Sequence, residues 1–61
     1  MSNGFISIYE IDGKFIGQVT FSNSHIAHVE PGSHDDQDEL IEKLQTVADD
    51  RNINIWSILR A

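Results

Sequence analysis

Residues 33–51 read SHDDQDELIEKLQTVADDR, and this stretch decides most of the fold. Its apolar residues recur at positions i, i+1, i+4, i+7 and i+8, the spacing of one helical face: Leu40, Ile41, Leu44, Val47 and Ala48. The pattern predicts an amphipathic helix with a single apolar stripe. Ser33 is its predicted N-cap, with Asp35 and Asp36 in the first turn, and Asn52 is predicted to close the helix.

Carboxylates fill most of the segment outside the apolar stripe. The acidic positions are Asp35, Asp36, Asp38, Glu39, Glu42, Asp49 and Asp50. A subset projects from one side at helical spacing, and we expect it to bind a partner: Asp35, Asp38, Glu39, Glu42 and Asp49. The alternative is a solvated face that keeps a small protein soluble.

Before this segment, two β-rich runs, residues 5–11 and 14–21, flank Asp12-Gly13. Asp-Gly between such runs predicts a two-residue hairpin turn, because both turn positions need positive φ. The turn pairs Ile11 with Lys14 and thereby fixes the face of every side chain. The predicted core face holds Ile6, Ile8, Phe15, Val19 and Phe21. The other face holds Phe5, Ser7, Tyr9, Ile16, Gln18 and Thr20.

Two further strands complete the predicted sheet. Residues 25–30 form the third, which Pro31-Gly32 ends, and a turn with a left-handed Asn23 precedes it. Residues 53–59 form the fourth, with Ile53, Ile55 and Leu59 on one face and Trp56 and Ile58 on the other. We therefore predict one α+β domain spanning residues 1–61. Its order is β-β-β-α-β, its sheet is mostly antiparallel in strand order 3-2-1-4, and one helix packs on one face.

A single helix covers only one side of a four-stranded sheet. The other side would expose Phe5, Tyr9, Ile16, Trp56 and Ile58, a large apolar patch for a small soluble chain. We expect Phe5, Tyr9 and Trp56 to bind a partner, and the chain to form a homodimer or to meet another protein through this side. A chain of 61 residues buries little surface by itself, which favours such an association.

The composition excludes several classes of function. The net charge is −6 and the four Lys and Arg residues are scattered, which disfavours direct binding of nucleic acid and of anionic membranes. The absence of cysteine excludes disulfides and thiolate zinc sites. Since the chain shows no signal-peptide pattern and no apolar run of membrane-spanning length, we expect a cytoplasmic protein.

The residues that carry chemistry form no recognised motif. His25, His28 and His34 with the neighbouring Asp35 and Asp36 are the one candidate metal cluster, but His25 and His28 point to opposite faces of a regular strand. No nucleophile elbow, phosphate-binding glycine loop or HExxH pattern is present. We expect neither an enzyme nor a cofactor.

In size, acidity and layout the chain resembles small phage-encoded inhibitors such as anti-CRISPR proteins and inhibitors of bacterial RNA polymerase. The resemblance implies a non-enzymatic inhibitor or regulator. From the acidic helix we expect docking on a basic surface of a nucleic-acid-handling protein, at sites that phosphates normally occupy. It assigns no residue a role. The alternative is a structural or regulatory homodimer, such as an antitoxin-like partner subunit.

Overall fold

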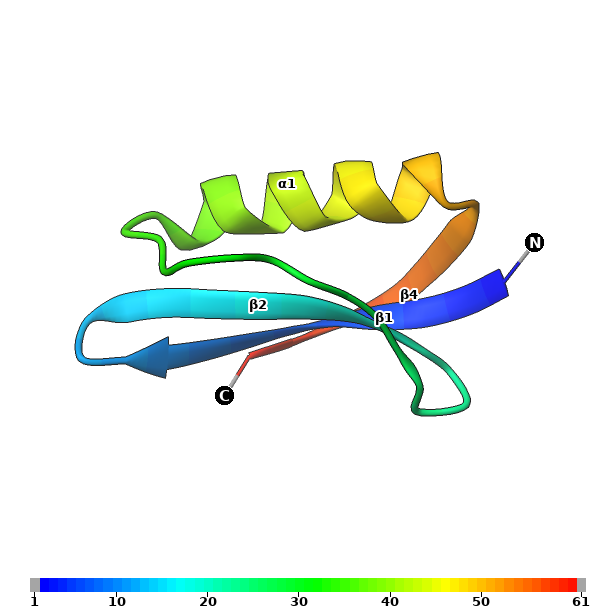
Figure 1. Ribbon diagram of the computed structural model, residues 1–61, viewed down its shortest axis with the longest axis horizontal. Helices are drawn as coiled ribbons and strands as arrows, with labels where there is room; N and C mark the ends of the chain where they lie inside the picture. Colours follow the sequence, from blue (N-terminus) through cyan, green and yellow to red (C-terminus); the bar gives the residue numbers. More distant parts are fainter. Residues whose placement is uncertain (1, 61) are drawn as a thin grey trace.

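The computed structural model describes residues 2–60, which form a four-stranded sheet with one helix along one side (Figure 1). The strands lie in the order β3-β2-β1-β4. Neighbours β1 and β2, and β2 and β3, are antiparallel, whereas β4 runs parallel to β1. The elements are β1 (Ser2–Ile11), β2 (Lys14–Phe21), β3 (Ile26–Val29), α1 (Gln37–Asp50) and β4 (Ile53–Arg60). The predicted fold class and strand order are confirmed.

The hairpin of β1 and β2 has the predicted register. Ile11 pairs with Lys14, and Asp12 and Gly13 both have positive φ, of 52° and 77°. These are the left-handed conformations that a two-residue hairpin turn requires. β1 begins at Ser2, three residues before the prediction, because its first residues pair with β4 from Ile53 onward.

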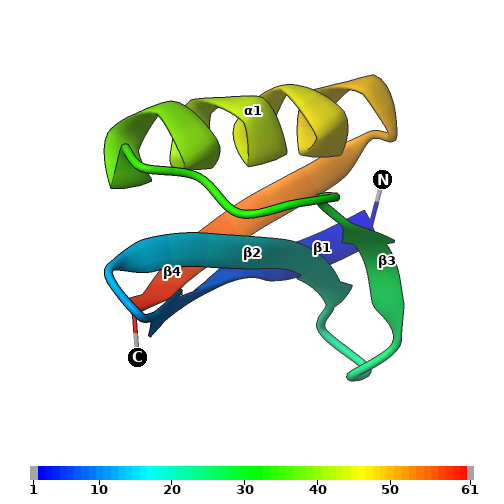
Figure 2. The ribbon, with the colours of Figure 1, turned by 60° about the vertical axis from the view of Figure 1, so that its left-hand side comes forward.

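β3 is a short edge strand that lies beside β2 (Figure 2). It begins at Ile26 and ends at Val29, within the predicted residues 25–30. Val19 pairs with His28 but Thr20 pairs with Ile26, so Ala27 is an extra residue in a β-bulge. In the preceding turn the left-handed residue is Ser24, with φ 76°, and not Asn23, whose side chain accepts a hydrogen bond from the His25 amide.

The helix begins later than predicted. Asp36 is the N-cap, and its carboxylate accepts hydrogen bonds from the amides of Asp38 and Glu39. The prediction of Ser33 was wrong because the chain after it is still tied to the sheet: the amides and carbonyls of His34 and Phe15 exchange two hydrogen bonds. At the other end Arg51 is the C-cap, and Asn52 follows with a φ of 58° and turns the chain into β4.

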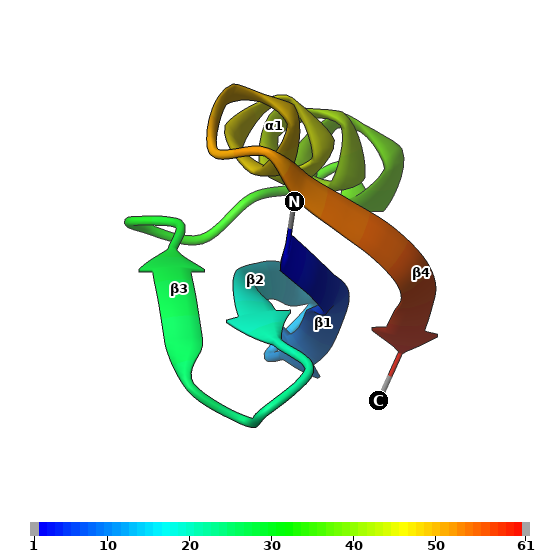
Figure 3. The same cartoon turned by 90° about the vertical axis from the view of Figure 1, so that its right-hand side faces the viewer.

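The core lies between α1 and one side of the sheet (Figure 3). α1 packs against β1, β2 and β4. The buried side chains are Ile6, Ile8, Val19, Leu40, Leu44, Ala48 and Ile53. The helical stripe and the hairpin register predicted all of them except Ile53 of β4. Four other predicted core residues are only partly buried: Phe15, Phe21, Ile41 and Val47. Gly17 lies beneath the helix, where a β-carbon would come within 2.6 Å of Leu44 Cδ1 and 2.9 Å of Ile8 Cδ1. A glycine at this position therefore lets α1 approach β2.

β4 contains a bulge that reverses the predicted faces of its second half. Gly4 pairs with Ile55 but Phe5 pairs with Ser57, so Trp56 is the extra residue. Beyond it Ile58 pairs with Ile6, on the helix side, and Leu59 pairs with Ser7, on the other side. The sequence prediction placed both residues on the wrong face because it assumed unbroken alternation.

Candidate interaction surfaces

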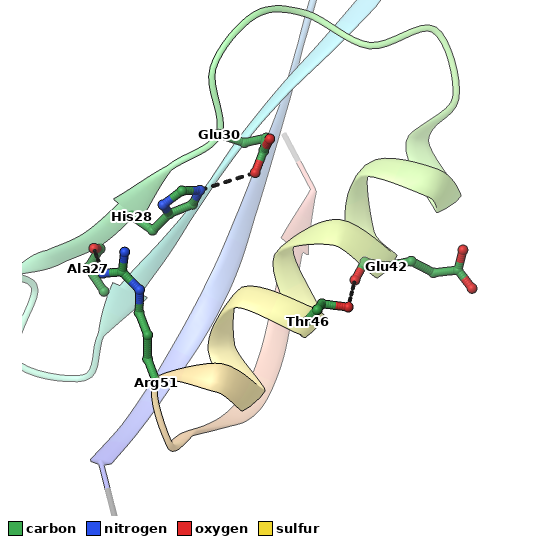
Figure 4. Close-up of polar contacts among 6 residues, drawn as sticks. All are labelled: Ala27, His28, Glu30, Glu42, Thr46 and Arg51. Carbon is green, nitrogen blue, oxygen red and sulfur yellow. Dashed lines mark hydrogen bonds and ion pairs between the residues drawn. The ribbon is translucent and has the colours of Figure 1, made fainter.

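The outer surface of α1 carries a row of exposed carboxylates. Asp38, Glu42 and Asp49 follow one another at helical spacing opposite the buried Leu44, and Glu39 lies beside them. We name these four residues the acidic ridge. The Glu42 carboxylate points away from the helix, while its backbone carbonyl accepts a hydrogen bond of 3.0 Å from the Thr46 hydroxyl (Figure 4). None of the four carboxylates takes part in the two ion pairs formed within residues 2–60.

Two predicted acidic residues do not belong to this ridge. Asp35 precedes the helix and forms an exposed ion pair with Lys14 of β2. Asp36 is occupied as the N-cap. The prediction that Asp35 lines up with the helix carboxylates was wrong, because the helix does not begin until Gln37.

The interaction of the ridge carboxylates with the helix dipole differs between the two ends of the ridge. Asp38 and Glu39 lie in the first turn, where the helix dipole favours negative charge. Asp49 lies near the C-terminal end, where the last turn holds no basic residue to balance it. The Gln45 amide donates a 3.2 Å hydrogen bond to the Asp49 carboxylate. Asp49 therefore has the least favourable position of the four carboxylates in the field of the helix dipole.

The side of the sheet opposite α1 is an exposed surface, which we name the open face. Seven large apolar side chains are exposed within residues 2–60, at 37 to 61%: Tyr9, Ile11, Ile26, Val29, Trp56, Ile58 and Leu59. Strand register places five of them on the open face and Ile58 on the helix side. Trp56 has no register partner, and its ring contact with Phe5 places it on the open face. Tyr9 and Ile16 pair there as predicted. Ile11 shares the parity of Tyr9 and could have been found from the sequence, whereas Leu59 could not, since its face depends on the bulge.

Trp56 and Phe5 form the aromatic part of the open face. Their rings make an edge-to-face contact with centroids 5.8 Å apart. The Trp56 indole donates a 3.0 Å hydrogen bond to the Ser22 hydroxyl, just beyond the end of β2. Trp56 thus reaches across the β1 strand, yet 61% of its surface is exposed, while the smaller Phe5 is half-buried. The indole is held in place and remains available to a partner.

The two groups of predicted partner-binding residues lie on opposite sides of the molecule. The ridge faces outward from α1, whereas Phe5, Tyr9 and Trp56 lie on the face of the sheet that α1 does not cover. A single flat partner surface would not reach both. The structure therefore separates the predicted site into two surfaces.

The three histidines do not converge on a metal site. His28 Nε2 lies 3.1 Å from a Glu30 carboxylate oxygen, and both side chains are partly buried at the β3 edge (Figure 4). His25 is exposed in the turn before β3, and His34 is bridged to Phe15 with its Nε2 atom buried and unpaired. Among the residues that the structure describes, no group of three or more histidine and carboxylate side chains is arranged to hold a metal ion.

The same view shows how the helix end is joined to the β3 edge. The Arg51 guanidinium donates a 2.7 Å hydrogen bond to the carbonyl of Ala27, the bulged residue (Figure 4). This contact occupies a backbone acceptor that the bulge would otherwise leave for a neighbouring chain. The β3 edge is accordingly short, bulged and partly capped, whereas β4 is an eight-residue edge strand.

The hollows on the surface are small or open. A pocket of about 190 Å³ lies between the end of α1 and the beginning of β4, lined by Gln45, Asp49, Asn52, Ile53, Asn54 and Ile55. A wider depression, of about 450 Å³, lies open on the outer surface of α1 around Glu42. Ligand pockets usually measure about 300–1,000 Å³ and enclose most of the ligand. Neither hollow combines that size with enclosure.

No protein-family model, curated protein or solved structure matches this chain. The structural evidence on function is therefore confined to the two surfaces described above. Within residues 2–60, α1 is too short and too polar to cross a membrane.

Proposed function

We propose that this protein is a non-enzymatic protein-binding module of the cytoplasm, an inhibitor or regulator whose acidic ridge docks on a basic surface of a nucleic-acid-handling protein. The unpaired row of carboxylates on the outer side of α1 carries this proposal. In this role the carboxylates stand in for phosphates, and neither a metal nor a cofactor takes part.

The spacing of the ridge supports phosphate mimicry. From Asp38 to Asp49 the helix rises by about 16 Å, so the four ridge carboxylates follow one another at a mean rise of about 5.5 Å. One strand of duplex DNA carries about one phosphate charge per 3.4 Å along its axis. A basic groove that accepts a nucleic-acid backbone would meet a row of negative charges on this helix, at a somewhat wider mean spacing than that of the phosphates. Such complementarity mainly speeds association and orients the partner.

A matched pair of charge reversals tests this proposal. Glu42→Lys changes the middle of the ridge, and Glu10→Lys makes the same change at the exposed end of β1, so each variant has a net charge of −4, which is −6 plus 2. Both should fold normally because both positions are exposed. A partner captured from the native host should be retained by the wild-type chain and by Glu10→Lys, and lost or weakened with Glu42→Lys, most clearly at low salt. Equal capture by all three proteins, indifferent to salt, would reduce the ridge to a solvated surface.

A second candidate function is a structural or regulatory homodimer, such as an antitoxin-like partner subunit. The observation in its favour is the open face, where exposed apolar side chains gather with no element of residues 2–60 to cover them. The two candidates use opposite sides of the molecule, so they are compatible. Light scattering on the isolated chain separates a pure monomer from a protein that associates with itself.

A further inference from the structure

We propose that a second copy of this chain covers the open face, so that two sheets pack face to face and both helices point outward. Six large apolar side chains on this face are between 40 and 61% exposed. Apolar patches of this kind on small soluble domains mark interaction sites. A chain of this size also buries too little surface by itself to be more than marginally stable, and a second sheet would add to its core.

The distribution of charge selects a second copy as the occupant. Glu10 is the only acidic residue within the four strands, and its pairing with Phe15 places it on the helix side. No Asp or Glu within the strands therefore lies on the open face, although the whole chain has ten acidic residues and a net charge of −6. Two copies would repel each other in most orientations. Face-to-face packing of the sheets puts the two acidic ridges on opposite outer surfaces, where this repulsion is smallest.

The one cation on this face is already neutralised. By register Lys14 shares the face of Ile11, at the end of the sheet near the hairpin turn, and its ammonium group is paired with Asp35. Three further polar residues of β1 and β2 on this face carry no charge: Ser7 and Thr20 are already buried, and Gln18 is partly buried. A partner with a strongly basic or acidic surface would find no complementary charge here. A second copy brings an equally neutral face, so no charge is left unpaired between the two sheets.

The area of the face suffices for a specific dimer. Three of the strands have eight to ten residues and β3 has four. At about 4.8 Å between strands and about 3.3 Å per residue, they span roughly 480 Å². Two copies would then bury roughly 1,000 Å² in total, which is the lower bound for a biological interface. Side chains that project from the sheet add to this flat area. Sheets that pack in this way lie about 10 Å apart. We therefore expect a dimer that dissociates on dilution.

The dimer deepens the proposed function, because two outward ridges would let one unit engage two basic surfaces. That bivalency rests on the proposed function, in which the ridge is a binding site. The dimer interface on the open face does not depend on the ridge. Capture of a partner tests the ridge, and self-association of the pure chain tests the dimer interface on the open face. Failure of one is thus distinguishable from failure of the other.

Adjacent residues of β4 provide a matched test. Leu59 lies on the open face and Ile58 on the helix side, at 49 and 37% exposure. We would measure sedimentation velocity of the wild-type chain, Leu59→Glu and Ile58→Glu over a range of concentrations, with circular dichroism to check folding. The wild-type chain should reach twice its 6.9 kDa mass, Leu59→Glu should weaken self-association at least about tenfold, and Ile58→Glu should not.

Three further variants keep the result decisive. If Ile58→Glu fails to fold, Ile58→Ser takes its place, and Glu42→Lys is the control on the helix side. Ile11→Glu, at the other end of the open face, should repeat the effect of Leu59→Glu. A wild-type chain that stays monomeric at all concentrations overturns the proposal. So does a dimer that Leu59→Glu and Ile11→Glu leave intact, or one that the helix-side variants break.

Discussion

The two sides of this sheet have similar side chains and opposite surroundings. On the helix side Ile6, Ile8 and Val19 are at most 1% exposed, whereas on the open face Tyr9 and Ile11 are 40 and 55% exposed. These residues alternate along the same two central strands. The open face also carries Ser7, Gln18 and Thr20, but large apolar residues occur on both faces. The chain supplies one helix for a sheet with two apolar sides, so the uncovered side keeps large apolar side chains exposed.

The largest expected effect contrasts a leucine on each side. Leu44→Ala should lower the free energy of unfolding by about 2–5 kcal/mol, because it leaves a cavity between α1 and the sheet. Leu59→Ala should cost less than about 1 kcal/mol in the monomer, since half of that side chain is already in water. Urea unfolding at low protein concentration measures both values. Similar losses for the two variants would mean that the open face is packed within one chain.

Gly17→Ala sharpens the comparison from the covered side. The new methyl group would meet Leu44 Cδ1 and Ile8 Cδ1 at less than 3.0 Å, so these buried side chains have to move. We expect a loss of about 1–3 kcal/mol in the free energy of unfolding. Gln18→Ala, at the next position of β2 and on the open face, is the control and should be nearly neutral. A neutral Gly17→Ala would show that α1 is not pressed against β2.

The helix that covers one side depends on its cap. Asp36→Ala removes the acceptor for two backbone amides and should cost about 1 kcal/mol in thermal or urea unfolding. Asp35→Ala removes only an exposed ion pair and should cost less than about 0.5 kcal/mol. If Asp35→Ala proved the more harmful, the helix would begin earlier than Gln37.

The smallest effect concerns the charge at the end of the helix. Asp49→Lys replaces an acid by a base near the C-terminus of α1, where the dipole favours positive charge. It should raise the free energy of unfolding by a few tenths of a kcal/mol at low salt. The same change should weaken binding of a basic partner. If Asp49→Lys gains stability and loses binding, Asp49 serves binding at the expense of helix stability. A loss of stability would contradict this role.

Most of the fold could be predicted from local chemistry. Asp12-Gly13 fixed the hairpin register, and the helical stripe identified Leu40, Leu44 and Ala48 as core residues. The position of β4 beside β1 followed from the few layouts that one crossover allows. These features depend on spacing within short segments, which a sequence displays directly.

The features that escaped prediction depend on contacts between distant segments. The helix starts at Gln37 because His34 is bonded to Phe15, nineteen residues earlier. The faces of Ile58 and Leu59 depend on a bulge at Trp56 that appears only once β4 pairs with β1. The separation of the aromatic residues from the acidic ridge likewise requires the packed structure. These three-dimensional constraints altered the candidate site more than they altered the fold.

The most direct test of the central claim, that the open face of one chain packs on that of another, is the emission of Trp56 during dilution. It is the only tryptophan, it lies on the open face, and it is 61% exposed in a single chain. We predict that its emission is blue-shifted in concentrated protein and moves to the red on dilution, with a midpoint that coincides with dissociation in sedimentation. Emission of a solvent-exposed indole at every concentration, or a dimer that forms without moving the spectrum, would contradict the account.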